Sequence, residues 1–374
     1  MKKLLYMSAI NENSKYVGVW KKIRMQMDYF QSQNIEVEFY DVNKKDNNTI
    51  ASIVRRRLPY TGVYDWAVDR DKIKNVDCVY IRKESVDYQL IKSLKRMKKY
   101  NSKIKILMEI PTYPYDNEEK LTYSNAMLIL KDRWNKRKLY KYVDYILTYS
   151  KNEMIFKIPT MRLSNAVDTS IVSAKKATLS DRSINIIAVA SFAFWHGYDR
   201  FLEGMHEYYK SDKENKLNIM LHLVGDGDEL VRYKSLVEDY NLHHYVCFYG
   251  RKDGKELDEV YDKCEIGLDA MGRHRANIYY NSTLKGKEYG AKGLPIISGV
   301  ETEIDSDTEY RYYMRVPANE SPVDMESVIN FYNQIYNIGE SKEKIISKIR
   351  EYNRNKFDIS IVWKKVADYI KADA

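Results

Sequence analysis

The residues of this sequence that point most directly to chemistry lie between Ser282 and Glu288. Two hydroxyl residues, Ser282 and Thr283, stand where a helical pattern begins, and Leu284 and Lys285 follow them. Hydroxyls and unpaired backbone N–H groups at a helix start, with a lysine one turn in, suit phosphate oxygens. Glu288 lies further along the same helix face, where a carboxylate can accept hydrogen bonds from both hydroxyls of a ribose. The segment therefore predicts a site for a nucleoside diphosphate.

The same segment has a plainer interpretation as an ordinary helix. Gly293 and Pro295 end the helical pattern and lead into a buried strand. Ser282 would then serve only as the helix cap, and Lys285 and Glu288 would form a surface ion pair three residues apart. Binding of a nucleotide separates the two interpretations.

A second group of polar and aromatic residues follows the apolar run 104–108. It contains Glu109, Tyr113, Tyr115 and Asp116. Ligands of parallel-sheet proteins bind beyond the carboxyl ends of the strands, so this group is expected to project toward a substrate. Aromatic rings beside carboxylates suit a sugar face and its hydroxyls, and we expect an acceptor to bind here. The alternative is a loop that is merely stiffened by its prolines.

The elements that must position these residues alternate between strands and helices. In the first half, short apolar runs at 4–7, 35–39, 78–81, 104–108 and 143–147 predict strands. Trp20, Ile23, Met27 and Phe30 recur at helical spacing after Gly18, which closes a polar loop at 10–18. The loop lacks complete GxGxxG spacing, so we expect Gly18 to border an acceptor, with a plain strand-to-helix turn as the alternative.

The second half repeats this design, with apolar runs at 184–189, 219–224, 246–249, 266–268 and 294–297. Strand-helix-strand order predicts parallel sheets covered on both faces, and thus an α/β protein of two Rossmann-like domains. We place the first domain at 1–168 and the second at 169–357. A stripe of Trp363, Val366 and Ile370 predicts a last helix, within about 358–374, that can return to the first domain.

Composition agrees with two ordinary domains. The chain has 374 residues, 44% hydrophobic and 31% charged, with 34 tyrosines. Its three cysteines lack CxxC spacing and predict neither a disulfide framework nor a zinc site. No apolar run reaches the roughly 20 residues that span a bilayer, and the start lacks the features of a signal peptide, so we expect a cytoplasmic protein.

Charge is divided unevenly along the chain. Residues 1–180 hold 35 Lys and Arg against 20 Asp and Glu, whereas residues 181–374 hold 27 against 33. A basic half attracts anionic partners, and an anionic membrane surface is the one we expect, as a peripheral contact on the inner face of the cell membrane. Nucleic acid is the less favoured partner because no recognisable nucleic-acid-binding module is present.

The segment 282–295 resembles the donor-site signature of retaining GT-B glycosyltransferases of the large bacterial cell-surface polysaccharide family, the group 1 glycosyl transferases. Glu288, followed by Ala291, Gly293 and Pro295, matches the family's ribose-binding carboxylate. The Ser-x-Leu-Lys sequence before the Glu-Tyr pair is similar to one subgroup. Two further segments resemble family motifs: Asn165-Ala166-Val167-Asp168 is similar to the Asn-Gly-Val-Asp linker, and Val224-Gly225-Asp226-Gly227 to the Gly-x-Gly turn after a central strand of the second domain. The resemblance implies that Gly225, Gly227 and Ser191 contact the donor.

The sequence departs from the family pattern at three positions. The first of the family's two carboxylates would fall at Tyr280, and the usual Arg and Lys that clamp the diphosphate are replaced by Ser191 and His196. A leaving diphosphate needs positive charge, and we expect Lys285 with Arg273 and Arg275 to supply it, without a metal or other cofactor. His196 can still donate a hydrogen bond to a phosphate or sugar hydroxyl. The resemblance thus assigns the chemistry to Lys285, Glu288 and His196.

The resemblance implies transfer of a hexose from a UDP-, GDP- or dTDP-linked sugar to a sugar hydroxyl of a glycan or polyprenyl-diphosphate-linked acceptor. Retention of the anomeric configuration and a place in capsule or exopolysaccharide synthesis are implied in the same way. A sugar-nucleotide epimerase of the same fold and a catalytically silent glycosyltransferase-like subunit remain as alternatives. The Asp305-Ser306-Asp307 triplet resembles a metal-binding Asp-x-Asp, but its position after the ribose helix argues against that use.

Overall fold

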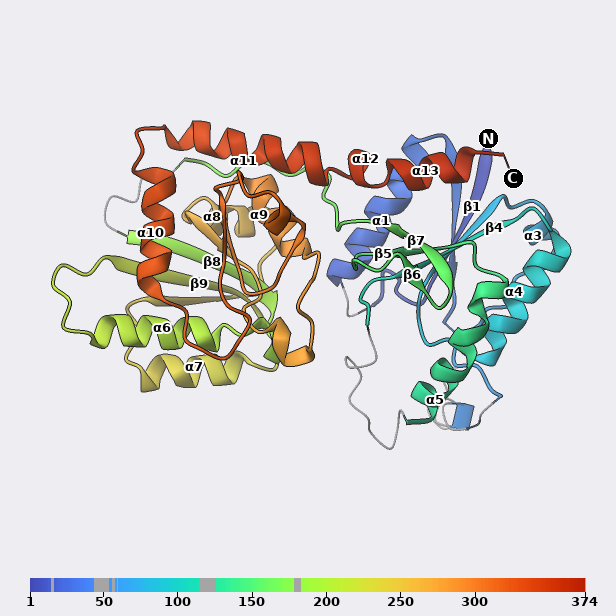
Figure 1. Cartoon of the computed structure of the whole chain (residues 1–374), viewed down its shortest axis with the longest axis horizontal. Helices are drawn as coiled ribbons and strands as arrows, with labels where there is room; N and C mark the ends of the chain where they lie inside the picture. Colours follow the sequence, from blue (N-terminus) through green and yellow to red (C-terminus); the bar gives the residue numbers. More distant parts are fainter. Residues whose placement is uncertain are drawn as a thin grey trace. The chain divides into compact units, whose positions relative to one another are not determined.

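The computed structural model describes residues 1–14, 17–43, 54–55, 58, 60–114, 126–177 and 183–373, without the side chain of Val17. The chain forms two compact units, 1–164 with 362–374 and 165–361, beside the expected boundaries at 168 and 358. The short helix α12 (Ile359–Val362) crosses from one unit to the other. Each unit is an α/β domain built on its own sheet (Figure 1).

The first unit contains a seven-stranded sheet in the order β2-β1-β3-β4-β5-β7-β6, parallel except where β6 meets β7. Its strands are β1 (Lys2–Ser8), β2 (Ile35–Asp41), β3 (Cys78–Arg82), β4 (Lys105–Ile110), β5 (Tyr145–Thr148), β6 (Met154–Ile155) and β7 (Ile158–Arg162). Its helices are α1 (Val17–Ser32), α3 (Arg70–Lys74), α4 (Tyr88–Tyr100), α5 (Ala126–Asn135), the 3₁₀ helix η1 (Lys136–Lys141) and α13 (Lys364–Lys371).

Helices cover both faces of this sheet. Alternate strand residues such as Ile81 and Met108 pack with α4, whose N-cap Asp87 accepts a hydrogen bond from the N–H of Leu90 at 2.9 Å. On the opposite face, the ring of Trp363 contacts those of Phe30 on α1 and Tyr80 on β3. The expected return of the C-terminal helix to the first domain is therefore confirmed.

The second unit contains a six-stranded parallel sheet in the order β10-β9-β8-β11-β12-β13. Its strands are β8 (Ser183–Ser191), β9 (Asn218–Asp226), β10 (Val246–Gly250), β11 (Ile266–Leu268), β12 (Ile296–Ser298) and β13 (Tyr313–Arg315). Its helices are η2 (Phe194–His196), α6 (Asp199–Lys210), α7 (Leu230–Asp239), α8 (Gly254–Tyr261), η3 (Arg273–Ala276), α9 (Leu284–Lys292), η4 (Glu303–Ser306), α10 (Met325–Tyr336) and α11 (Lys342–Phe357).

Neighbouring residues of β8 point to opposite faces, which explains its continuous apolar sequence. Ile186 joins a core with α6, α7 and α10, whereas Ile187 joins a second core with α8 and α9. Figure 1 shows α6 and α7 on one side of this sheet and α8 and α9 on the other. All ten predicted strands are present, and β6, β7 and β13 were not predicted.

Candidate functional site

The predicted donor residues gather at one edge of the second sheet. β8, β9, β11 and β12 are parallel, so their carboxyl ends share this edge. Because α9 connects β11 to β12 and runs back across the sheet, its N-terminus lies at the same edge. An edge of this kind is where α/β proteins bind their ligands.

Two loops of this edge are packed backbone to backbone. The N–H of Met271 donates to the carbonyl of His196 at 2.7 Å. Gly197 has a φ of 63°, and a Cβ built on it would lie 2.5 Å from the backbone nitrogen of Gly272. A side chain at 197 would force the loops apart, so this glycine sets the distance between η2 and η3.

The start of α9 differs from the expected one. The helix begins at Leu284 with Thr283 as its N-cap, whose hydroxyl accepts from the N–H of Gly286 at 3.2 Å and donates to Asp269. Ser282 precedes the helix and accepts from the N–H of Asn165 at 2.7 Å. The expectation that both hydroxyls line the phosphate cradle therefore needs correction, because both are buried and engaged within the protein.

The atoms left for an anion are those of the next two residues. Within the described part of the chain, neither the backbone N–H groups of Leu284 and Lys285 nor the ammonium of Lys285 has a hydrogen-bonding partner. Burial lowers the pKa of Lys285 to about 8; Asp269 opposes this shift and Arg273 adds to it. A half-buried ammonium in this position gains free energy when an anion arrives.

His196 lies beside this lysine in its neutral form. Its Nδ1 accepts a hydrogen bond from the N–H of Ala193 at 2.9 Å, which leaves the ring proton on Nε2. Burial lowers the pKa of His196 well below its usual value, and the charges of Lys285 and Arg273 lower it further. The imidazole is therefore available as a hydrogen-bond donor rather than as a cation.

Arg275 is held by other groups. Its guanidinium contacts Asp199 at 2.8 and 3.0 Å and Glu320 at 2.6 Å. Arg273 is on the same 3₁₀ helix, and its guanidinium lies 5.8 Å from the ring centroid of Trp195. The structure thus brings Arg273 to His196 and Lys285, whereas Arg275 binds η3 to α6 and the loop at Glu320. Glu288 is exposed on α9, close enough to Lys285 to oppose the lowering of its pKa.

Gly225 and Gly227, at the end of β9, are required by close packing of the backbone. Their φ angles are 136° and 148°, and a Cβ on them would lie 1.8 Å from the carbonyl oxygen of Ala190 and 2.4 Å from that of Phe192. The two glycines let the loops after β8 and β9 touch. Ser191 is exposed at the end of β8, in register with Asp226.

Asp269 is a site residue that was not predicted from the sequence. This buried carboxylate follows β11 directly, accepts from the N–H of Ala270 at 2.7 Å and holds the hydroxyl of Thr283. The sequence signal that could have identified Asp269 was its position immediately after a predicted strand.

Asp305, from the Asp-x-Asp triplet, accepts hydrogen bonds from the N–H of Thr302 at 2.7 Å and from the hydroxyl of Tyr313 at 2.8 Å.

Glu109 does not face a substrate as expected. Its side chain is 0% exposed and accepts from Lys22 at 3.0 Å, Arg82 at 3.0 Å and the hydroxyls of Tyr80 and Tyr149 at 2.6 Å each. Burial by itself would raise the pKa of Glu109, but its two cationic partners outweigh burial and lower it. Glu109 is the centre of a buried ionic cluster in the first unit.

The other expected acceptor residues are only partly described. Gly18 is exposed in the first turn of α1, and a Cβ built on it would meet nothing within 4 Å. Tyr113 is half-buried with its ring against that of Phe156. Tyr115 and Asp116 lie outside the described residues.

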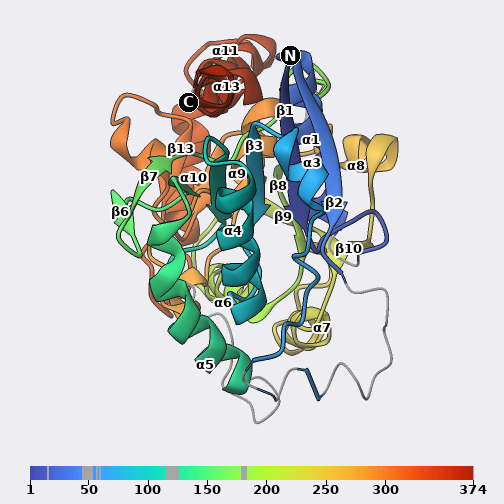
Figure 2. The ribbon, with the colours of Figure 1, turned by 90° about the vertical axis from the view of Figure 1, so that its right-hand side faces the viewer.

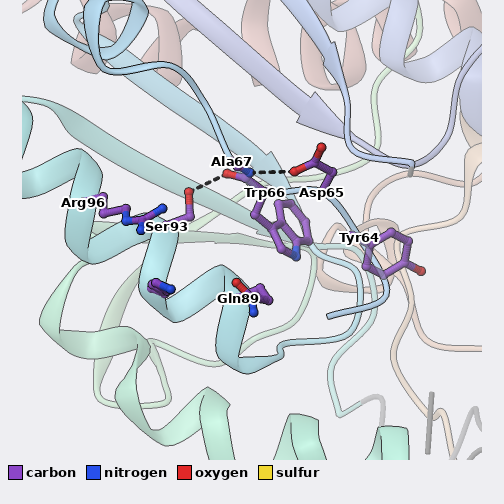
Figure 3. Close-up of a pocket in the computed structure, with 8 residues that line it drawn as sticks. Tyr64, Asp65, Trp66, Ala67, Gln89, Ser93 and Arg96 are labelled. Atoms are coloured by element: carbon purple, nitrogen blue, oxygen red, sulfur yellow. Dashed lines mark hydrogen bonds between the residues drawn. The ribbon is translucent and has the colours of Figure 1, made fainter. Parts of the chain in front are cut away.

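A cavity of about 70 Å³ lies in the first unit. Figure 3 shows it between the segment 64–67 and α4, with Arg96 and Ser93 facing the segment. The indole N–H of Trp66 is buried without an acceptor among the described residues, and Ser93 donates to the carbonyl of Trp66. The cavity contains none of the residues assigned to donor or acceptor.

No described helix is both long and apolar enough to cross a membrane. The three cysteines are free.

Comparison with known proteins agrees with this architecture. Residues 172–268 match the family model of the glycosyl transferases group 1, and a comparison with curated proteins gave no match. Among solved structures, sucrose-phosphate synthase from Thermosynechococcus elongatus is similar at 13% identity, with 99% of this chain and 98% of that chain covered and a TM-score of 0.65.

Two further solved structures are similar over the whole chain. They are HepE of Anabaena in complex with UDP (11% identity, 99% of both chains, TM-score 0.60) and the apo form of the lipopolysaccharide outer core galactosyltransferase WaaB (14% identity, 100% of both chains, TM-score 0.61). These similarities extend over both α/β units. The chain therefore has the GT-B fold of glycosyltransferases over its full length.

Proposed function

We propose that this protein is a glycosyltransferase that moves a hexose from a nucleoside diphosphate sugar to a sugar hydroxyl of a lipid-linked or oligosaccharide acceptor. The observation that carries the proposal is the half-buried ammonium of Lys285, which has no partner among the described residues and lies beside His196 at the start of α9. UDP is the nucleotide we expect, since HepE was solved with UDP and UDP-glucose.

Each donor-site residue has its own role in the proposed reaction. The amides of Leu284 and Lys285 with the charges of Lys285 and Arg273 stabilise the diphosphate as negative charge develops on the leaving group. Nε2–H of His196 donates to a phosphate or sugar oxygen, and the exposed carboxylate of Glu288 accepts from the ribose hydroxyls. With this much positive charge, the proposed reaction requires no metal.

In the proposed reaction the bond between the sugar C1 and the diphosphate oxygen breaks as the acceptor oxygen bonds to C1 on the same face. The acceptor proton passes to the departing phosphate oxygen, so the products are the nucleoside diphosphate and a glycoside of retained configuration. This route needs no protein base, which agrees with the burial of Glu109. We place the activity in the synthesis of cell-surface polysaccharide.

The test is nucleotide binding followed by product analysis. Titration calorimetry with UDP, GDP and dTDP should show binding of one of them, weakened at least tenfold by Lys285→Ala and unaffected by Lys255→Ala, an exposed lysine of the same unit. Absence of binding to all three refutes the donor site. Sugar derivatives of whichever nucleotide binds are then incubated with the protein, with and without a glycan acceptor. A parallel reaction contains EDTA. An altered free nucleotide sugar formed without acceptor would identify an epimerase.

A further inference from the structure

The segment formed by α5 and η1, residues 126–141, exposes large apolar side chains and buries several polar ones on α5, although Leu139 of η1 is buried in the ordinary way. Leu130 and Trp134 are 55% and 75% exposed, although they lie one turn apart on α5. On the opposite face, Lys131, Asp132 and Asn135 are buried. A helix on a water-exposed surface normally turns its apolar residues inward and its charged residues outward.

The buried polar residues of α5 all have partners within the protein, so the orientation of this helix is built into the fold. The ammonium of Lys131 donates to the carbonyls of Arg55 at 2.8 Å and Thr61 at 2.9 Å. Asp132 accepts from the N–H of Val86 at 2.8 Å, and Asn135 donates to the carbonyl of Lys131. These contacts fix which side of the segment faces out. As a result, the side chains of Leu130 and Trp134 face solvent.

The outward face is basic as well as apolar. Arg133, Arg137 and Lys141 are exposed on the same segment, and Tyr140 adds a ring that is 49% exposed. The segment's one acidic residue, Asp132, is buried near Lys83 and Lys136. Figures 1 and 2 show α5 at the periphery of the first unit, next to α4.

We propose that this face, Leu130, Arg133, Trp134, Arg137, Tyr140 and Lys141, docks the protein on the surface of an anionic bilayer. Tryptophan and tyrosine favour the boundary between headgroups and acyl chains, and leucine enters it. Exposed arginine and lysine attract anionic headgroups at short range. An apolar face bordered by cations, without an exposed carboxylate, fits a negatively charged lipid surface better than a glycan or a neutral protein surface. The docking is independent of the proposed glycosyl transfer.

The experiment is flotation of the full chain with vesicles of phosphatidylcholine containing 30% phosphatidylglycerol, against phosphatidylcholine alone. Wild type should float with the anionic vesicles and lose binding as salt rises. Leu130→Ser with Trp134→Ser should lower the partition coefficient at least about tenfold, since two apolar side chains no longer leave water. Arg133→Ala with Arg137→Ala should lower it about 25-fold, at about fivefold for each cation.

Matched variants in the second unit control for surface apolarity and charge. Ile171→Ser with Val231→Ser removes two exposed apolar residues, and Arg354→Ala with Lys356→Ala removes two exposed cations. Both should float like wild type. Trp134→Phe should abolish the blue shift of tryptophan fluorescence that accompanies vesicle binding. An unchanged circular dichroism spectrum and an unchanged urea midpoint in every variant show that the chain is folded.

Two results would overturn the docking proposal. One is wild-type protein that stays unbound to anionic vesicles at low salt, and the other is vesicle binding that the Leu130 and Trp134 changes leave intact. If those changes alter sedimentation of the protein alone and not flotation, the face contacts a second copy of the chain and the proposal is wrong.

Discussion

Lys285 should make nucleotide binding depend on pH in the range where an ordinary lysine does not titrate. With its pKa at about 8, most of the ammonium is protonated at pH 7 and little of it at pH 9. A diphosphate binds the protonated form. The dissociation constant should therefore rise about tenfold between pH 7 and pH 9, which corresponds to about 1.4 kcal/mol.

The direction follows from linkage between proton and ligand. The bound diphosphate raises the pKa of Lys285, so binding takes up a proton above pH 8 and affinity falls as the proton becomes scarce. The phosphate ionises near pH 6 and does not titrate in this range. Calorimetry in two buffers of different ionisation enthalpy measures the proton uptake directly.

Lys285→Arg is the control for this prediction. A guanidinium stays protonated throughout, so the variant should bind the nucleotide with an affinity that is flat between pH 7 and pH 9. The Lys285→Ala variant should bind the nucleotide weakly, with an affinity that does not change between pH 7 and pH 9. A wild-type dissociation constant that is the same at pH 7 and pH 9, or an arginine variant with the wild-type slope, would refute this account of the site.

Three further predictions concern the ribose, the buried cluster and the loop contact. Glu288→Ala should weaken binding of UDP about tenfold and of 2′-deoxy-UDP much less, because the carboxylate loses hydrogen bonds that only an intact ribose supplies. Glu109→Gln should lower the free energy of unfolding by about 3 to 5 kcal/mol, measured by urea denaturation, because two buried cations lose their counter-charge. Gly197→Ala should abolish nucleotide binding, because its methyl group would overlap the backbone of Gly272, whereas Gly250→Ala, at a similar φ but with nothing within 4 Å, should bind normally.

Each of these has an outcome that contradicts it. Equal effects on the two nucleotides would remove Glu288 from the ribose. Glu153→Gln, an exposed carboxylate of the same unit, is the control for Glu109, and equal stability of the two variants would contradict the ionic cluster. Equal binding by the Gly197 and Gly250 variants would show that the loop contact does not shape the site.

The strands and their order along the chain could be predicted from the sequence because buried parallel strands are nearly continuous apolar runs. β7 was missed because Pro159 interrupts it, and β13 because its three residues show no clear periodicity. The helix at 284–292 was predicted almost to its first residue, since its cap and its terminal glycine are local signals.

Which side chains remain available to a ligand was decided by tertiary structure alone. In the sequence, Glu109 after an apolar run and Lys285 at a helix start are both charged residues that could meet a ligand, yet Glu109 has four partners and Lys285 has none in the described part of the chain. Arg273 and Arg275 are likewise indistinguishable in sequence, and only Asp199 and Glu320 separate them.

The exposure of Leu130 and Trp134 on α5 was likewise decided by tertiary contacts. Periodicity shows which residues share a helix face, but whether that face is buried depends on partners such as the carbonyls of Arg55 and Thr61, which are far away in sequence. The sequence by itself therefore determined the elements, the α/β class and the segment 282–295, because these follow from local patterns. Tertiary structure decided which charged side chains pair within the protein and which stay available to a ligand, because burial and ion pairing depend on residues distant in the chain.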